Sequence, residues 1–122
     1  MAKHNELGIT GEDIAVNYLI SKGYRILERN WRSGHKELDV VAEFGPELVV
    51  VEVKTRRNND FGNPEDAVNS RKIKRIVLAT DAYLKFKQID ATVRFDVVTV
   101  LFNHAGKYEV KHLEDAFFAP MW

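Results

Sequence analysis

Two carboxylates and a lysine lie in two neighbouring runs of apolar residues. Asp39 lies in the first run, and Glu52 and Lys54 lie two positions apart in the second. Carboxylate oxygens are the protein ligands that Mg²⁺ prefers, and this ion keeps its other coordination positions for water and phosphate. An ammonium group beside such an ion stabilises the negative charge that develops during attack on a phosphodiester. These residue types therefore indicate metal-assisted hydrolysis.

The two runs have the pattern of consecutive strands joined by a short turn. They lie within residues 36–56 and are separated by Phe44-Gly45-Pro46, a turn signal. Because side chains alternate across a strand, Glu52 and Lys54 share one face, and the short turn makes Asp39 a cross-strand neighbour of Glu52. Burying such charges without partners costs several kcal/mol, so they must be paired, solvated or bound to an ion.

A salt bridge is the alternative interpretation of the same three residues. Lys54 could pair with Asp39 or Glu52 at a solvated end of the sheet, and such a pair contributes at most about 1 kcal/mol. An Asp followed later in the chain by Glu-x-Lys is also a pattern that many sheets contain by chance. The spacing alone leaves both interpretations open.

A helix is predicted before the strands, over residues 6–22. Thr10 and Asp13 have capping-box spacing and mark one start, and Asn5 could cap a longer version. Glu12 falls in the first turn of this helix. From spacing alone its simpler role is that of an acid interacting with the positive end of the helix dipole.

The remaining elements complete a mixed sheet with a second helix. They are a strand at residues 24–31, a loop at 58–63, a helix from about Ser70 to Lys87 after start signals at 63–66 and 69–70, a strand at 92–102 and a shorter strand at 107–112. The order helix, three strands, helix, two strands predicts an α/β (α+β) fold, in which helices flank a central mixed sheet. One domain over residues 1–122 is expected.

Composition excludes several classes of protein. A length of 122 residues suits one core, and a hydrophobic content of 45% argues against disorder. The absence of cysteine excludes disulfides and thiolate metal sites. The sequence has no apolar run long enough for a membrane span and no signal-peptide core, so a cytoplasmic protein without a membrane partner is expected.

Basic residues occur in two clusters, although 18 acidic and 18 basic residues leave a net charge of zero. Any contact with nucleic acid must therefore come from local clusters and not from an overall field. The candidates for phosphate contact are Arg56, Arg57, Arg71, Lys72, Lys74 and Arg75. The alternative for the second cluster is an ordinary solvated helix face.

Other ionisable residues are interpreted without catalytic roles. Asp96 could join the acidic cluster, but an ion pair with a basic residue is expected. His35 could contact a phosphate, but a solvated turn residue is expected. The other histidines, His4, His104 and His112, show no spacing typical of metal ligands.

Several short motifs together resemble one protein family. They are Gly11-Glu12-Asp13-Ile14-Ala15, Gly23-Tyr24, Arg29-Asn30-Trp31-Arg32, Glu37-Leu38-Asp39, Val51-Glu52-Val53-Lys54-Thr55-Arg56, Phe61-Gly62-Asn63-Pro64 and Arg94-Phe95-Asp96-Val97. As a set, from about residue 8 to about residue 100, they are similar to the YraN family, small bacterial proteins for which an endonuclease activity is proposed. Asp39 with Glu52-Val53-Lys54 also resembles the PD-(D/E)xK motif of the restriction-endonuclease-like superfamily, whose core has the same order of elements.

The resemblance implies a role for each site residue. At this site the pattern is similar to archaeal Holliday-junction resolvases, so Asp39 and Glu52 would be metal ligands and the Val53 carbonyl a third oxygen. Lys54 would be the catalytic lysine, and Glu12 an additional helix-borne carboxylate near the metal. The implied cofactor is Mg²⁺ or Mn²⁺.

Two positions depart from the resembled pattern. Leu38 stands where the name of the superfamily has Pro, and Lys36 stands where many relatives have Gly. The shape of the chain before Asp39 is therefore expected to differ, while every implied ligand is present.

The expected function is a metal-dependent endonuclease acting on DNA, either structure-selective or weakly sequence-specific. The sequence has no recognition helix or set of base-stacking aromatics, so contacts should be mostly to the backbone, and branched DNA is one expected substrate. The alternative is a nucleic-acid-binding module on the same fold with little or no turnover. A third is a protein–protein adaptor that uses the apolar tail, residues 116–122. Monomer and homodimer are both open.

Overall fold

Two helices and five strands follow one another in the predicted order. The computed structural model describes residues 10–57, 69–103 and 105–117. Its elements are α1 (Gly11–Ser21), β1 (Arg25–Ser33), β2 (Lys36–Phe44), β3 (Glu47–Arg57), α2 (Ser70–Lys87), β4 (Thr92–Phe102) and β5 (Tyr108–Phe117). The expected α+β fold class is confirmed. The predicted loop at 58–63, the helix-start signal at 63–66, His4, His104 and the tail beyond Phe117 lie outside the described residues.

The five strands form one sheet in the order β1-β2-β3-β4-β5. Neighbouring strands are antiparallel except β3 and β4, which are parallel and have α2 between them in the chain. Parallel neighbours need a long crossover connection, whereas an antiparallel pair needs only a tight turn. Gly45 has a φ of 60°, which glycine adopts without strain, so the predicted turn signal joins β2 to β3 as a hairpin.

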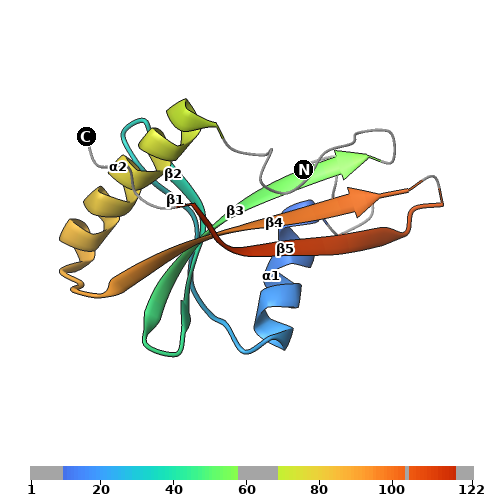
Figure 1. Cartoon of the computed structure of the whole chain (residues 1–122), viewed down its shortest axis with the longest axis horizontal. Coiled ribbons are helices and arrows are strands. Elements are labelled where there is room, and N and C mark those ends of the chain that lie inside the picture. The colour runs from blue at the N-terminus through green and yellow to red at the C-terminus, as the bar shows by residue number, and fades with distance from the viewer. Residues whose placement is uncertain (1–9, 58–68, 104, 118–122) are drawn as a thin grey trace.

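The two helices cover opposite faces of the sheet (Figure 1). The core under α1 contains Leu19 with Val49 and Val51 of β3, whereas the core under α2 contains Tyr83 with Val50. Successive side chains of β3 therefore point to different helices, as the period of two residues along a strand requires. Within the described residues, neither helix is long and apolar enough to cross a membrane.

Local hydrogen bonds set the starts of both helices. The Thr10 side chain accepts a hydrogen bond from the Asp13 N–H (3.1 Å), and the Asp13 carboxylate accepts one from the Thr10 N–H (3.0 Å), which completes the predicted capping box. Asn69 accepts a hydrogen bond of 2.9 Å from the Lys72 N–H, so α2 begins at Ser70 as predicted.

Two strands run further than predicted. β1 continues to Ser33 instead of ending at Trp31, because its last residues pair with the start of β2. β5 continues to Phe117 instead of ending at His112, because its pairing with β4 resumes after a register shift. The resumed pairing places Phe117 opposite Phe95, and the two rings stack with centroids 4.9 Å apart.

Candidate active site

The sheet divides between β2 and β3, and the predicted carboxylates lie where it divides. Backbone pairing of these strands ends at Val40 and Val51. Beyond that pair, the start of β2 pairs with β1, and the end of β3 pairs with β4. The next residue of each strand is Asp39 or Glu52, so both carboxylates lie at this fork. In Figure 1, β3 extends with β4 and β5 away from β1 and β2.

A backbone hydrogen bond across the fork holds Asp39. The Val53 N–H donates to Asp39 Oδ2 at 2.9 Å. A strand N–H without a neighbouring strand needs another acceptor, and this carboxylate provides one. Burial raises the pKa of Asp39, and the hydrogen bond from Val53 opposes that rise. One oxygen of Asp39 is therefore oriented by the protein itself.

The half-buried carboxyl group of Asp39 and the buried one of Glu52 interact with each other. Glu52 is only 9% exposed. Burial, and then the negative charge of Asp39, raise the pKa of Glu52 to about 7. A hydrogen bond between the two side chains acts in opposite directions, lowering the pKa of Asp39 and raising that of Glu52. Ionisation of both groups at once is therefore disfavoured, and a cation beside the pair opposes that effect.

The ion pair at Glu52 is made by Lys72 of α2. Lys72 Nζ lies 3.1 Å from Glu52 Oε1. Its positive charge opposes the rise in pKa of both carboxyl groups. Lys72 was predicted only as a phosphate contact, and the salt-bridge interpretation named Lys54 as the partner. Sequence reasoning missed this ion pair because α2 follows a long connection.

Lys54 lies on the same side of the sheet but makes different interactions. Its side chain is half-buried, and burial lowers its pKa, followed by the positive charges of Lys72 and Arg56. The negative charge of Glu52 opposes this lowering of the Lys54 pKa, so the two side chains interact electrostatically. Lys54 pairs in register with Thr99, whose buried hydroxyl has no hydrogen-bond partner in the part of the chain described. A bound water or ligand could satisfy that hydroxyl.

A cavity of about 510 Å³ joins the fork to α2. It is lined by His35, Lys36, Glu37, Asp39, Glu52, Lys72, Arg75, Ile76 and Leu78. Cavities of this size bind small ligands or one part of a larger one. Because carboxylates and basic side chains converge in it, a cation and an anion bound together would complement its charges. His35 is an exposed turn residue, as predicted, yet it also lines this cavity.

Glu12 is held by residues of β1. Its carboxylate accepts hydrogen bonds from Arg29 Nε (3.0 Å) and from the Asn30 side-chain amide to both oxygens (3.1 and 3.0 Å). Asn30 has a φ of 53°, a strained conformation for a non-glycine residue. The charge of Glu12 raises the pKa of Asp39, so it acts on the fork. Its oxygens are nevertheless bound to Arg29 and Asn30, which motif spacing could not show.

Gly11 allows α1 to approach β3 closely. A Cβ atom at this position would overlap the hydroxyl oxygen of Thr55 on β3. The first turn of α1, which carries Glu12, is therefore in direct contact with the strand that carries Glu52 and Lys54. This contact gives a physical reason for a glycine at the first position of the helix.

The predicted phosphate contacts fall into two groups. Lys72 and Arg75 line the cavity. The structure does not bring the other four into it: Arg71 and Lys74 are exposed on α2, Arg56 is half-buried on β3, and Arg57 is exposed at the end of β3. A contact between these four and nucleic acid outside the cavity remains a prediction.

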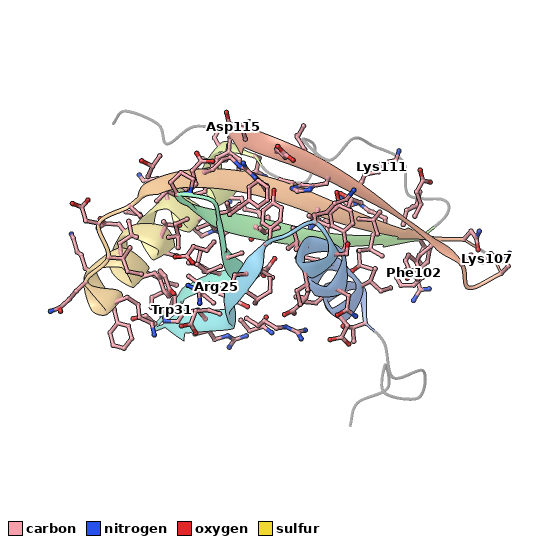
Figure 2. All side chains as sticks on the ribbon, turned by 90° about the horizontal axis from the view of Figure 1, so that it is seen from below. Arg25, Trp31, Phe102, Lys107, Lys111 and Asp115 are labelled. Atoms are coloured by element: carbon pink, nitrogen blue, oxygen red, sulfur yellow. The ribbon has the colours of Figure 1, made fainter. Side chains whose placement is uncertain are left out.

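Asp96 belongs to a separate network on the α1 side of the sheet. It is fully buried and forms the expected ion pair, with Arg94 at 2.9 Å. His112 Nε2 lies 2.7 Å from Asp96 Oδ2, and the N–H of Asp115, labelled in Figure 2, donates to Oδ1 at 3.0 Å. Burial alone would raise the pKa of Asp96, but the hydrogen bonds from His112, Arg94 and Asp115 hold it below its ordinary value. Asp96 therefore stabilises the fold and stays outside the acidic pair.

The donor set at the fork fits Mg²⁺ or Mn²⁺. Among the described residues, no group of three or more His, Asp or Glu side chains comes together as a metal site, so the structure does not gather Glu12 with Asp39 and Glu52. Mg²⁺ usually takes one or two carboxylates from a protein and retains several waters. The carboxyl groups of Asp39 and Glu52, whose pKa values burial raises, are a donor pair of that kind.

A second hollow, of about 270 Å³, lies between α2, β4 and β5. Its described lining is mainly apolar, with Asp81 and Asp115 as the charged members and no basic side chain. It therefore offers nothing to a phosphate, and the cavity at the fork is the better candidate site.

Comparison with known sequences gives one family. Residues 11–100 match the family described as "Uncharacterised protein family UPF0102". The chain is 54% identical to a UPF0102 protein of Phocaeicola vulgatus and 54% identical to one of Bacteroides thetaiotaomicron, in each case over the full length of both chains. It is 45% identical to a UPF0102 protein of Christiangramia forsetii, over 97% of this chain and 98% of that one. The chain therefore belongs to the UPF0102 family, the YraN family that its motifs resemble.

Proposed function

We propose that this protein is a metal-dependent endonuclease that hydrolyses phosphodiester bonds of DNA at the β2–β3 fork. The observation that carries the proposal is the interaction between the half-buried carboxyl group of Asp39 and the buried one of Glu52, in a cavity that also holds basic side chains. Burial disfavours ionisation of both groups, and the charge of Asp39 adds to this effect at Glu52; Lys72 offsets part of this effect, and a bound divalent ion would offset more.

The arrangement of the fold supports the same proposal. Two acidic residues on neighbouring antiparallel strands, a parallel β3–β4 pair and a helix on each face resemble the restriction-endonuclease-like core. Fold alone does not establish activity, so the support comes from the residues at the fork.

Each residue at the fork has a proposed task. Asp39, oriented by the Val53 N–H, and Glu52 would bind the ion, with the Val53 carbonyl as a third oxygen. The bound ion would polarise the phosphate and lower the pKa of an attacking water. Lys54 would stabilise the negative charge of the transition state. Glu12 would add negative potential beside Asp39 and favour the cation.

The substrate is proposed to be recognised through its backbone. Lys72 and Arg75 line the cavity, and Arg56 and Arg57 follow Lys54 on the same strand. Contacts to phosphates position a nucleic acid without reading its bases, which suits a structure-selective or weakly sequence-specific enzyme. Branched DNA in the cytoplasm of a bacterium is the proposed target.

One observation favours a second candidate function. The Lys72–Glu52 ion pair neutralises the carboxylate without a metal. A protein that kept this pair permanently would be a nucleic-acid-binding module with no turnover.

A cleavage assay separates the two functions. Purified protein is incubated with four-way junctions, flaps and linear duplexes in Mg²⁺, in Mn²⁺ or in EDTA. Cleavage of one of these DNAs with a divalent ion, its absence in EDTA and its absence in a Glu52→Gln variant of normal melting temperature are expected. If the parent protein binds these DNAs equally well in Mg²⁺, Mn²⁺ and EDTA and cleaves none of them, the protein is a nucleic-acid-binding module instead.

A further inference from the structure

Lys72 is placed at the fork by local structure at the start of α2. Its backbone N–H donates to the Asn69 cap at 2.9 Å, which fixes the first turn of the helix. Its side chain then reaches Glu52, with 3.1 Å between Nζ and Oε1. The side chain of Lys72 is 29% exposed and that of Glu52 is 11% exposed. Lys72 is therefore the more exposed member of the pair.

The ammonium group of Lys72 and a bound divalent ion would compete for the same carboxylate of Glu52. Both are hard cations that neutralise a carboxylate, and the carboxylate lies in a partly dehydrated cavity where a cation is required. Lys72 and Lys54 offset the negative charge that the two carboxyl groups carry when ionised. If a divalent ion replaces Lys72 on Glu52, the fork gains positive charge, which favours a phosphodiester anion.

Once released from Glu52, the ammonium group of Lys72 could contact a substrate phosphate bound in the same cavity. A lysine has a flexible four-carbon stem and three donors, so it can turn without a change in the helix. Arg75 lies one helical turn after Lys72 and lines the same cavity. A phosphate bound there would meet both cations.

We propose that Lys72 is a further catalytic residue of this site, which occupies the cation position beside Glu52 in the metal-free protein and contacts the substrate phosphate once a divalent ion has taken that position. This inference rests on the proposed function. It differs from a purely structural role, in which the ion pair would only tie α2 to β3 and would persist in the metal-bound protein.

Calorimetric titration with Mn²⁺, without DNA, tests the first half of the proposal. Lys72→Met keeps most of the stem and removes the charge. Lys85→Met removes the same charge from the other end of α2, where Lys85 pairs with Asp81 at 2.9 Å. Removal of a competing cation should tighten Mn²⁺ binding about tenfold in Lys72→Met, equivalent to about 1.4 kcal/mol, and leave it unchanged in Lys85→Met. Unchanged Mn²⁺ affinity in Lys72→Met would overturn the inference and leave the proposed function standing.

DNA affinity with and without metal tests the second half. Fluorescence anisotropy with a labelled four-way junction is measured in EDTA and in saturating Ca²⁺, which also binds carboxylate oxygens. Lys72→Met should lose about fivefold or more in affinity in Ca²⁺ and little in EDTA, where Lys72 is already bound to Glu52. An equal loss in both conditions would overturn the phosphate contact. No Mn²⁺ binding by either the parent or Lys72→Met would overturn the inference and the proposed function together.

Discussion

The backbone N–H of Val53 donates a hydrogen bond of 2.9 Å to Asp39 across the point where β2 and β3 separate. This single bond satisfies a strand N–H that has lost its neighbouring strand and fixes the orientation of a carboxylate. The break in the sheet therefore leaves free the N–H that orients this carboxylate.

Replacing Asp39 in two ways separates its structural role from its charge. Asp39→Asn retains an oxygen that accepts from Val53 and removes repulsion with Glu52, so it should be at least as stable as the parent protein. Asp39→Ala leaves that N–H without an acceptor and should be about 1–3 kcal/mol less stable than Asp39→Asn. Urea denaturation measures the difference. Both variants should lose stabilisation by Mn²⁺, and equal stability of the two would show that the hydrogen bond contributes nothing.

Metal binding should depend on pH through Glu52. The pKa of Glu52 is raised to about 7, above its ordinary value of 4.5, so ionising it for a metal releases a proton. Mn²⁺ affinity should rise about tenfold per pH unit between about pH 5 and about pH 7 and then level off. In the metal-free protein the free energy of unfolding should depend on pH in the opposite direction. The stabilisation from protonated Glu52 is complete below pH 4.5 and is lost as the pH rises through about 7.

Calorimetry in two buffers of different ionisation enthalpy counts the released protons. About one proton should be released near pH 6 and none near pH 9. Affinity that stays flat from pH 5 to pH 8 would mean that Glu52 is ionised throughout and is not part of a carboxyl pair.

A double-mutant cycle tests the contact between Gly11 and Thr55. Gly11→Ala should destabilise the protein by about 1–3 kcal/mol, although Ala favours helix, because its methyl group overlaps the Thr55 hydroxyl. Thr55→Ala removes that hydroxyl and should recover about 1 kcal/mol or more in the double variant. Strictly additive effects in thermal or urea unfolding would show that α1 does not approach β3 this closely.

Two arginines of α2 should differ in their contribution to DNA binding. Both are exposed on the same helix, but Arg75 lines the cavity and Arg71 does not. Arg75→Ala should reduce DNA affinity more than Arg71→Ala and lower the slope of log affinity against log salt by about 1, because one phosphate contact is lost. Anisotropy titrations at several salt concentrations give both values. Equal losses would indicate a diffuse basic face instead of a defined phosphate position.

Local sequence signals predicted much of the fold. Thr10, Asp13 and Asn69 act within one turn of their own helix, so their spacing predicted the start of α2 and one of the two candidate starts of α1. The turn at Gly45 is equally local, and it was sufficient to predict that Asp39 and Glu52 are neighbours. The extension of β5 to Phe117 was not predictable, because it depends on a register shift against β4.

The electrostatic details of the site required the three-dimensional structure. Lys72 meets Glu52 only because α2 packs on the face of the sheet that carries Val50. The φ of 53° at Asn30 and its hydrogen bonds to Glu12 depend on how α1 packs beside β1. The family resemblance implied that Glu12 is a carboxylate of the site, but not that its oxygens are bound by Arg29 and Asn30.

The single-turnover rate of DNA cleavage by Lys54→Ala tests most directly whether the fork is a reaction centre or a salt-bridged end of a sheet. If Lys54 stabilises the transition state, the variant should fold with a loss of at most about 1 kcal/mol and bind Mn²⁺ normally. Its cleavage of the preferred DNA should be slower than that of the parent by on the order of a hundredfold or more. Cleavage at the parental rate, or no cleavage by the parent protein with Mg²⁺ or Mn²⁺, would contradict the account.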